Sequence, residues 1–402
     1  MKTKLNLSVI FTSILLCIVL FVSAHQKKPK PVPAQVETVK STVVTAEPQT
    51  EMRGLWVSFI TLDMTDTDKT FESFKAKFNK IVMTAKEYKL NTLIVQVRPF
   101  CDALYKSSIF PYSHILTGTQ GKDPGYDALE YMCEHAHLNG LKLHAWINPY
   151  RVSTASSPEK LAKNNPYNQN KDIALELESG IILNPAKKAT RKLIVDGVKE
   201  IIENYDIDGI QFDDYFYPTD TGNEDIADYN NYKKALSTNS AIQSHTEWRF
   251  WNVNTMIAEV YATVKAADKN IVFGISPQGN IENNKALYAD ITTWCKTYGY
   301  ADYICPQMYY STENPSLSFE DSLIEWNNLN YHSDISVYIG LGAYKAGSDA
   351  DNGTWLDNSN ILATELQLLR KYKYDGFMIY DYSAFENEKA SDELKNLLSA
   401  IG

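Results

Sequence analysis

The sequence predicts a single (β/α)₈ barrel, and three observations lead to that prediction. Short β-branched or aromatic runs alternate with amphipathic stretches of helical spacing from about residue 51 to the end of the 402-residue chain. Eight such runs in roughly 350 residues match the strand count and size of a (β/α)₈ barrel. A doubly wound open sheet is the competing architecture, but no Gly-rich phosphate loop follows the first run.

The elements follow one another in a regular order. A helix end with Gly140 in the left-handed position leads directly into a strand, as in a βα unit. Helices are expected at 71–88, 126–140, 189–205, 251–267, 361–373 and 390–402. The strand candidates are 53–59, 91–99, 141–149, 207–213, 270–277, 301–309, 335–343 and 374–382.

The first 50 residues have a different character from the rest. Residues 1–24 combine two lysines, an apolar run and a small-residue ending, which predicts a secretory signal peptide. The apolar run at 5–22 is also long enough for an uncleaved membrane anchor, which is the alternative. Residues 25–50 are rich in Pro, Lys and Thr and lack aromatic residues, so we expect a flexible tether. The barrel domain is therefore expected at 51–402, in a secreted or envelope-associated protein.

Charge argues against some partners. The formal net charge is −10, and residues 51–402 carry 33 basic and 47 acidic side chains. An acidic body repels phosphate backbones, so nucleic acid is not an expected partner. We expect a neutral or weakly charged substrate instead.

Metal and cofactor sites are not expected either. Cys101, Cys133, Cys295 and Cys305 are too widely spaced for a zinc site or a disulfide-dense scaffold, and we interpret them as buried free thiols. The acid-rich stretches 220–228 and 348–355 lack the alternating oxygen pattern of a calcium loop and are predicted to be solvated. The long polar segment 219–248 is expected to be a loop insertion that forms one wall of a groove over the barrel mouth.

Polar and aromatic side chains gather where the predicted strands end, which is where a barrel of this kind carries its chemistry. Amide and hydroxyl groups interleaved with Trp and Tyr suit sugar rings, which have polar rims and apolar faces. A basic phosphate clamp is missing. The candidate substrate-binding residues are Trp56, Arg98, His144, Asn148, Gln211, Gln278, Gln307, Tyr309 and Tyr380.

The candidate catalytic residues are carboxylates. Asp213 and Asp214 stand side by side at the end of the fourth strand, and neighbouring like charges raise at least one pKa. Alternation points Asp213 inward, as nucleophile, base or orienting group, while Asp214 could act as the acid if its loop bends inward. Asp381 and then Asp102 are the next candidates. Carboxyls ~5 Å apart would predict retention and ~6.5 to 9.5 Å inversion, and both outcomes stay open.

Each of these residues also has a structural interpretation. Asp213 could form a buried ion pair with Arg98, because buried charges need partners. Asp214 could cap a turn in the loop. His144 lies mid-strand among apolar residues, where a hydrogen-bonded core histidine is more common than a general base.

Seven motifs together resemble one known family. They are EMRGLWVSF, VQVRPFCDALY, HAWINPYR, GIQFDDYFYP, GISPQGN, CPQMYY and GFMIYDY, in order along residues 50–400. The chain is similar to the glycosyl-hydrolase-like family 10 proteins, which are bacterial secreted or envelope proteins. The resemblance implies a TIM-barrel enzyme that acts on glycosidic bonds, and some members are reported to cut peptidoglycan glycan strands.

A more distant likeness concerns family 18 chitinases, which carry DGxDxDxE on the fourth strand and MxYD on the sixth. This chain has DGIQFDDY and QMYY there, so Asp208, Gly209, Asp213 and Tyr309 match. Tyr215 falls where the chitinases have their proton-donating glutamate, and Gln211 replaces the first inner aspartate. The chitinase mechanism therefore does not transfer intact.

Three functions remain in view. The first is a secreted or envelope-associated glycoside hydrolase of a polysaccharide, such as peptidoglycan strands or another N-acetylated glycan. The second is a glycan-binding barrel that has lost its proton donor. The third is another reaction on glycans, transglycosylation or deacetylation, although the metal-ligand trio that a deacetylase needs is not evident in the sequence.

Overall fold

The computed structural model describes residues 51–236 and 244–402. The expected signal peptide, membrane anchor and tether, residues 1–50, lie outside the described residues. Among the helices of the described part, none is long and apolar enough to cross a membrane.

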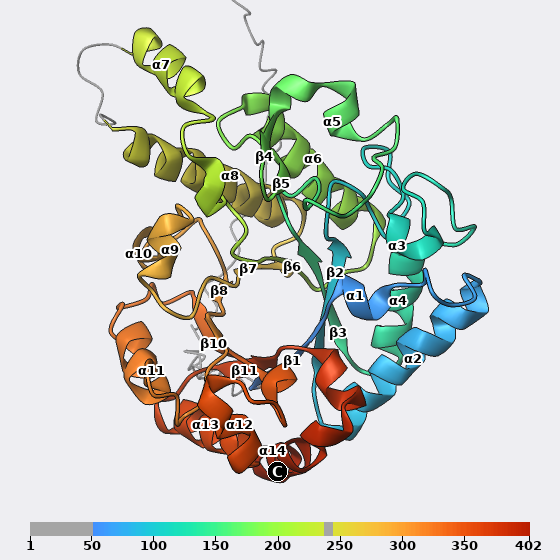
Figure 1. The fold of residues 1–402 in the computed structure, drawn as a ribbon, viewed down its shortest axis with the longest axis vertical. Helices are drawn as coiled ribbons and strands as arrows, with labels where there is room; N and C mark the ends of the chain where they lie inside the picture. Colours follow the sequence, from blue (N-terminus) through green and yellow to red (C-terminus); the bar gives the residue numbers. More distant parts are fainter. Residues whose placement is uncertain (1–50, 237–243) are drawn as a thin grey trace, which may run out of the picture. The chain divides into compact units, whose positions relative to one another are not determined.

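Parallel strands close into a barrel at the centre of the fold (Figure 1). The ring is closed because β11 pairs with β1 on one side and with β10 on the other. All eight predicted strands are present, and the sixth is split in two at Cys305 and Pro306, which confirms the (β/α)₈ barrel. The barrel strands are β1 Met52–Val57, β2 Thr92–Arg98, β3 Lys142–Ile147, β6 Gly209–Phe212, β7 Val272–Ile275, β8 Tyr303–Ile304, β9 Gln307–Met308, β10 Ser336–Leu341 and β11 Gly376–Ile379.

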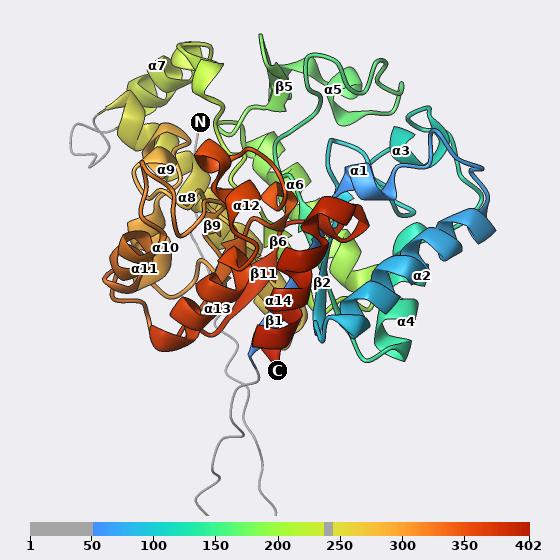
Figure 2. The same cartoon turned by 60° about the horizontal axis from the view of Figure 1, so that its bottom comes forward.

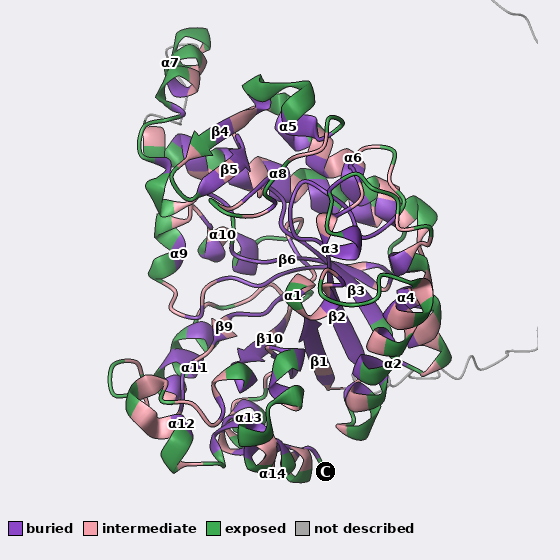
Figure 3. Cartoon of the chain, turned by 45° about the vertical axis from the view of Figure 1, so that its right-hand side comes forward, coloured by how far each residue is buried: buried purple, intermediate pink, exposed green. Residues whose placement is uncertain are grey.

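Helices surround the barrel, with buried faces toward the strands and exposed faces outward (Figure 3). The long ones are α2 Phe71–Glu87, α4 Ala128–Leu138, α6 Lys188–Asn204, α8 His245–Ala267, α13 Ile361–Lys371 and α14 Ser391–Ile401. These match the six predicted helices, but α8 starts six residues earlier, where Ser244 and Glu247 form a capping box. The shorter ones are α1 Phe59–Leu62, α3 His114–Thr117, α5 Pro166–Gln169, α7 Ile226–Ala235, α9 Asn283–Ala286, α10 Ile291–Lys296, α11 Phe319–Asn327 and α12 Thr354–Asp357.

The floor of the barrel is filled by large side chains set against glycines. The His144 ring lies 3.1 Å from the Tyr303 hydroxyl, and both residues are buried. A Cβ atom at Gly274 would lie 1.9 Å from the Tyr303 ring, and one at Gly209 would lie 2.7 Å from the His144 ring. Glycine is therefore required at both positions so that the two rings can pack inside the barrel.

Two inserted segments extend beyond the carboxyl ends of the strands. The first, between β3 and α6, contains α5 and an antiparallel hairpin of β4 Ala174–Leu177 and β5 Gly180–Leu183. The second follows β6 and contains α7. Figure 2 shows α5, β5 and α7 at the same end of the barrel. The first insertion was not predicted, because its elements are only four residues long.

The prediction of a plain loop at 219–248 is wrong, because this segment contains α7 and the first turn of α8. Asp225 is fully buried there and binds the Arg249 guanidinium through two contacts, of 2.9 Å to Nε and 2.5 Å to Nη2. The acid-rich stretch 220–228 is thus held by a buried ion pair and is not simply solvated.

A second pair of buried acids lies away from the barrel mouth, between α13 and α14. Glu365 and Glu393 are both buried, and neither carboxylate oxygen of Glu365 has a hydrogen-bond partner among the described residues. Burial raises the pKa of Glu365 well above its usual range, and the neighbouring Glu393 charge adds to this. Glu365 therefore stays protonated in the folded protein at a pH where the unfolded chain ionises it, so stability falls as pH rises above the usual glutamate range.

The Glu365→Gln variant is expected to unfold at a higher temperature than the wild type, with a larger gain at pH 8 than at pH 5. The gain at pH 8 should be on the order of 1 to 3 kcal/mol, because an amide removes the penalty of a buried ionisable group. Thermal unfolding at both pH values measures it. Glu134→Gln, on the exposed side of α4, is the control and should leave the unfolding temperature unchanged at both pH values. An equal shift at both pH values would contradict the prediction.

Candidate active site

An inner cavity of 350 Å³ opens at the carboxyl end of the barrel strands. Seven residues predicted from the sequence line it, and four further residues complete the wall. The lining residues are Trp56, Trp146, Asp213, Asp214, Tyr215, Ser276, Gln278, Gln307, Tyr309, Tyr344 and Tyr380.

Asp213 is the inward carboxylate of this cavity. It follows β6 directly, where strand alternation turns its side chain toward the barrel axis. Its Oδ2 accepts hydrogen bonds from Trp146 Nε1 at 3.0 Å and from Asn148 Nδ2, and its Oδ1 accepts from the Tyr215 backbone N–H at 3.3 Å. Three donors thus fix the position of one buried carboxylate.

The orientation of Asn148 is itself determined by its neighbours. Its Oδ1 accepts from Gln96 Nε2 at 2.6 Å and from Arg151 Nη2 at 2.9 Å, so its Nδ2 is left to face Asp213. Gln96 is held in turn by the Phe59 backbone N–H, which donates to its Oε1 at 3.0 Å. Asn148 therefore positions Asp213 from behind the cavity wall.

Asp214 also reaches the cavity, because the chain bends inward after β6. Its Oδ1 accepts from Gln307 Nε2 at 3.1 Å, and its Oδ2 accepts from Gln278 Nε2. Gln307 is anchored by a second bond, donated from the same Nε2 to the Ser276 carbonyl at 2.8 Å. The two adjacent aspartates are thus held by different amides, Asn148 for Asp213 and Gln278 and Gln307 for Asp214, and each keeps its own orientation.

The electrostatics of the pair follow from burial. Loss of water, together with the negative charge of Asp214, raises the pKa of Asp213 to about 7, while the Arg151 charge opposes the shift. Burial also raises the pKa of Asp214, against the hydrogen bonds from Gln278 and Gln307. The pair therefore holds one proton near neutral pH, which gives it one acid and one base.

Aromatic rings form a large part of the cavity wall. Tyr309 and Tyr380 stack at a centroid distance of 5.1 Å and an angle of 23°. Trp56 meets the edge of Tyr380 at 6.0 Å, and Tyr344 meets it at 5.7 Å. Gln211 does not line the cavity, but its Oε1 accepts from Trp56 Nε1 at 2.9 Å and so orients the indole. Such a wall can pack against the apolar face of a sugar ring.

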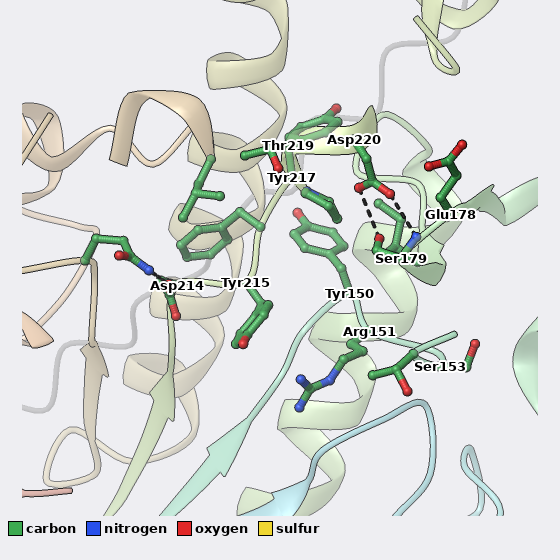
Figure 4. Close-up of a pocket in the computed structure, with 16 residues that line it drawn as sticks. Tyr150, Arg151, Ser153, Glu178, Ser179, Asp214, Tyr215, Tyr217, Thr219 and Asp220 are labelled. Carbon is green, nitrogen blue, oxygen red and sulfur yellow. Dashed lines mark hydrogen bonds between the residues drawn. The ribbon is translucent and has the colours of Figure 1, made fainter. Parts of the chain in front are cut away.

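An outer cavity of 720 Å³ adjoins the inner one (Figure 4). It lies between the segment after β3, the β4–β5 hairpin and the segment after β6. The two cavities share Asp214, Tyr215 and Gln278. Tyr215 is half exposed and lies under the Arg151 guanidinium, 4.9 Å from its ring centroid. The two cavities thus adjoin at Asp214, and together they are called the groove below.

Arg98 does not line this groove. The pairing of β2 with β3 shifts register between Gln96 and Arg98, so strict alternation fails and Arg98 turns toward the helix layer. There its guanidinium lies 4.5 Å from the Phe110 ring centroid and packs against Gly197 of α6. The positive charge near Asp213 comes instead from Arg151.

Three other candidates also lie elsewhere. His144 belongs to the barrel floor described above. The Asp381 carboxylate accepts from the Ser383 backbone and hydroxyl and so caps the turn after β11. Asp102 is buried against Gln120, whose Nε2 donates to it at 2.9 Å. Asp213 and Asp214 thus remain the two carboxylates that line the inner cavity.

Several lining residues were not nominated from the sequence. Arg151 stands in the motif HAWINPYR, whose polar ending after a strand was the available signal, and Trp146 of the same motif was expected only as core or cleft wall. Tyr344 follows the seventh predicted strand directly, where any side chain is near the barrel mouth. Tyr215 was noted only as the replacement for a chitinase glutamate, and no pattern separates a lining tyrosine from an ordinary surface one.

The described part of the chain contains no group of three His, Cys, Asp or Glu side chains arranged to hold a metal ion. The four cysteines at 101, 133, 295 and 305 are buried and free, as predicted.

The fold and this site define a class of protein: a glycosidase-like TIM barrel with paired carboxylates at the carboxyl ends of its strands. Residues 51–357 match the family described as "Glycosyl hydrolase-like 10", and the chain belongs to that family.

Two relatives from well-studied bacteria support this assignment. "Glycosyl hydrolase YngK" of Bacillus subtilis is 32% identical over 325 residues, which cover 76% of this chain and 63% of the relative. "Glycosyl hydrolase DigH" of Escherichia coli is 29% identical over 363 residues, which cover 82% of each protein. The match thus spans less than two thirds of YngK.

Solved structures with the same fold are also glycosidases by name. The glycoside hydrolase domain of PgaB (BpsB) from Bordetella bronchiseptica superimposes with a TM-score of 0.57 at 12% identity, covering 87% of this chain and 99% of that one. An alpha-L-fucosidase from Paenibacillus thiaminolyticus gives 0.55 at 12% identity, covering 88% and 49%. At these identities the likeness concerns the fold alone.

Proposed function

We propose that this protein hydrolyses O-glycosidic bonds within a polysaccharide outside the cytoplasm. The observation that carries the proposal is the pair Asp213 and Asp214, two adjacent buried carboxyls that both line the inner cavity at the mouth of the barrel. A glycosidase needs one carboxyl to protonate the leaving oxygen and one carboxylate to act at the anomeric carbon. The aromatic wall supplies contact area for the sugar ring.

The substrate is proposed to be a neutral or weakly charged glycan, either peptide-free peptidoglycan strands or another N-acetylated polysaccharide. The acidic body of the protein and the amide and tyrosine groups of the groove support this class. Secretion is part of the proposal and rests on the residue pattern at 1–24.

Release of new reducing ends from a panel of glycans tests the function. The panel contains peptide-free peptidoglycan strands, chitin oligomers and plant glycans, each incubated with the wild-type protein and with Asp213→Asn and Asp214→Asn. Cleavage of one glycan by the wild type, lost in both variants without unfolding, supports a hydrolase. Tight binding of a glycan without cleavage would instead favour the second candidate, a barrel that holds glycan without cutting it. The observation behind that candidate is Tyr215, which stands where chitinases have their proton donor.

Arg151→Met is expected to move the alkaline limb of the pH profile to higher pH. The Arg151 charge lowers the pKa of Asp213, so its removal raises that pKa and the pair keeps its proton to a higher pH. The pH dependence of kcat/KM measures the limb. Arg151→Lys keeps the charge and should keep the limb in place. A limb that moves downward, or that moves equally in both variants, would contradict the role given to this charge.

A further inference from the structure

The groove has two unequal parts, and the two carboxylates are distributed unevenly between them. Asp213 lines the inner cavity only, whereas Asp214 lines both cavities. The inner cavity is lined on one side by the aromatic wall and has 350 Å³ of space, while the outer one is about twice as large at 720 Å³. Both volumes are in the range of small-ligand sites.

The chemistry of glycoside cleavage requires a particular arrangement of the two carboxyls. The proton donor must reach the oxygen that joins two sugars, so it lies at the boundary between their sites. The second carboxylate acts at the anomeric carbon, or on the water that attacks it, so it faces only the sugar that keeps this carbon. Asp214 occupies the first position in this groove and Asp213 the second.

We infer that the groove has a defined polarity. The inner cavity holds the sugar whose anomeric carbon is attacked, and the outer cavity holds the leaving, reducing-end part of the glycan. The inference rests on the proposed function and specifies how the same site binds its substrate. In the step itself, Asp214 gives its proton to the glycosidic oxygen as the bond from that oxygen to the anomeric carbon breaks. A water oxygen replaces it at that carbon by one of two routes. In the first, water attacks directly and Asp213 takes its proton; in the second, Asp213 first bonds to the carbon, and water then breaks that bond while Asp214 takes the water proton.

The proton of the Asp213–Asp214 pair has a different place in the substrate-free protein and in the reaction. Without substrate, burial and the Asp214 charge raise the pKa of Asp213, which favours the proton there. Positive charge that develops on the sugar in the inner cavity stabilises Asp213 as an anion, because Asp213 faces that cavity alone. The single proton of the pair then belongs on Asp214, where the leaving oxygen lies.

Part of the outer cavity lining comes from the β4–β5 hairpin, which lies outside the barrel strands. Glu178 lies at the turn of the β4–β5 hairpin, is exposed, and is labelled at the far side of the cavity in Figure 4. Tryptophan at this position introduces a bulky ring into the outer cavity. Glu224 is also exposed but does not line either cavity, so Glu224→Trp is a control with the same change of charge and bulk.

Two probes separate the two sides of the groove. One is a tetrasaccharide that the wild type cleaves, from chitin or from peptide-free peptidoglycan. The other is the glycosyl fluoride of the same sugar, which has the attacked sugar but only a fluoride as leaving group. Glu178→Trp is expected to lower kcat/KM for the tetrasaccharide by about tenfold or more and to change that for the fluoride by less than about twofold. Glu224→Trp should change neither.

The other possible results of this experiment each contradict one part of the proposal. Loss on both probes would place the attacked sugar in the outer cavity and reverse the polarity. Loss on neither would show that the outer cavity does not bind sugar. In both cases the wild type still cleaves, so the proposed function stands while the inference fails. If the wild type cleaves no tetrasaccharide from chitin or from peptide-free peptidoglycan and no matching glycosyl fluoride, the proposed function is overturned, and the inference with it.

Discussion

Asp213→Asn is expected to lower kcat/KM on the order of 10³- to 10⁴-fold, on an oligosaccharide and on the matching glycosyl fluoride alike. Asp213 faces the anomeric carbon, and both substrates need a group there, whatever the leaving group is. An amide cannot act as nucleophile or base, so the loss does not depend on how easily the leaving group departs.

The fold should survive this change, because asparagine has nearly the same shape and its Oδ1 can still accept from Trp146 Nε1 or Asn148 Nδ2. Thermal unfolding and glycan binding by calorimetry serve as controls, and both should remain close to the wild-type values. Activity within tenfold of the wild type would show that Asp213 is a structural residue, and the site would then need another carboxylate.

Asp214→Asn is expected to separate the two substrates. Hydrolysis of the oligosaccharide should fall by about 10²- to 10⁴-fold, because no group protonates its leaving oxygen. Hydrolysis of the glycosyl fluoride should fall by less than about tenfold, because fluoride needs little help to leave.

The comparison of the two variants is the decisive measurement. If Asp213→Asn spared the fluoride and Asp214→Asn did not, the two roles would be exchanged and the polarity of the groove would reverse. Gln278→Ala is a useful companion variant, because it removes one hydrogen bond to Asp214 and leaves the carboxyl in place. It should weaken oligosaccharide cleavage less than Asp214→Asn does.

The barrel was predictable from the sequence because its signal is repeated. Eight strands and six long amphipathic helices follow one another in the same repeated order, so an error in one element leaves the whole recognisable. The inward direction of Asp213 was predictable for the same reason, since alternation along β6 is regular. The split of the sixth strand at Pro306 was not, although a proline there removes one backbone donor from the sheet.

Some residues that were predicted to lie in the site lie elsewhere, for reasons that the periodicity of the sequence does not reveal. Arg98 left the expected face because of one register shift, which depends on pairing with β3 and not on the sequence of β2 alone. His144 lies on the predicted inner face but near the floor, since alternation gives the side of a strand and not the depth along the barrel axis. The Asp381 carboxylate accepts a hydrogen bond from the nearby Ser383 hydroxyl and does not line the cavity. Aspartate forms such local hydrogen bonds readily at turns.

The origin of the groove walls has a consequence for how this family diversifies. The carboxylates and their amide partners stand on barrel strands or directly after them, whereas much of the outer cavity is contributed by inserted segments such as the β4–β5 hairpin. Insertions of this kind can change in length and sequence without moving the barrel. Exchange of the hairpin between relatives should therefore transfer a preference for one glycan over another while the chemistry stays the same. Natural selection could tune the two halves of the groove independently.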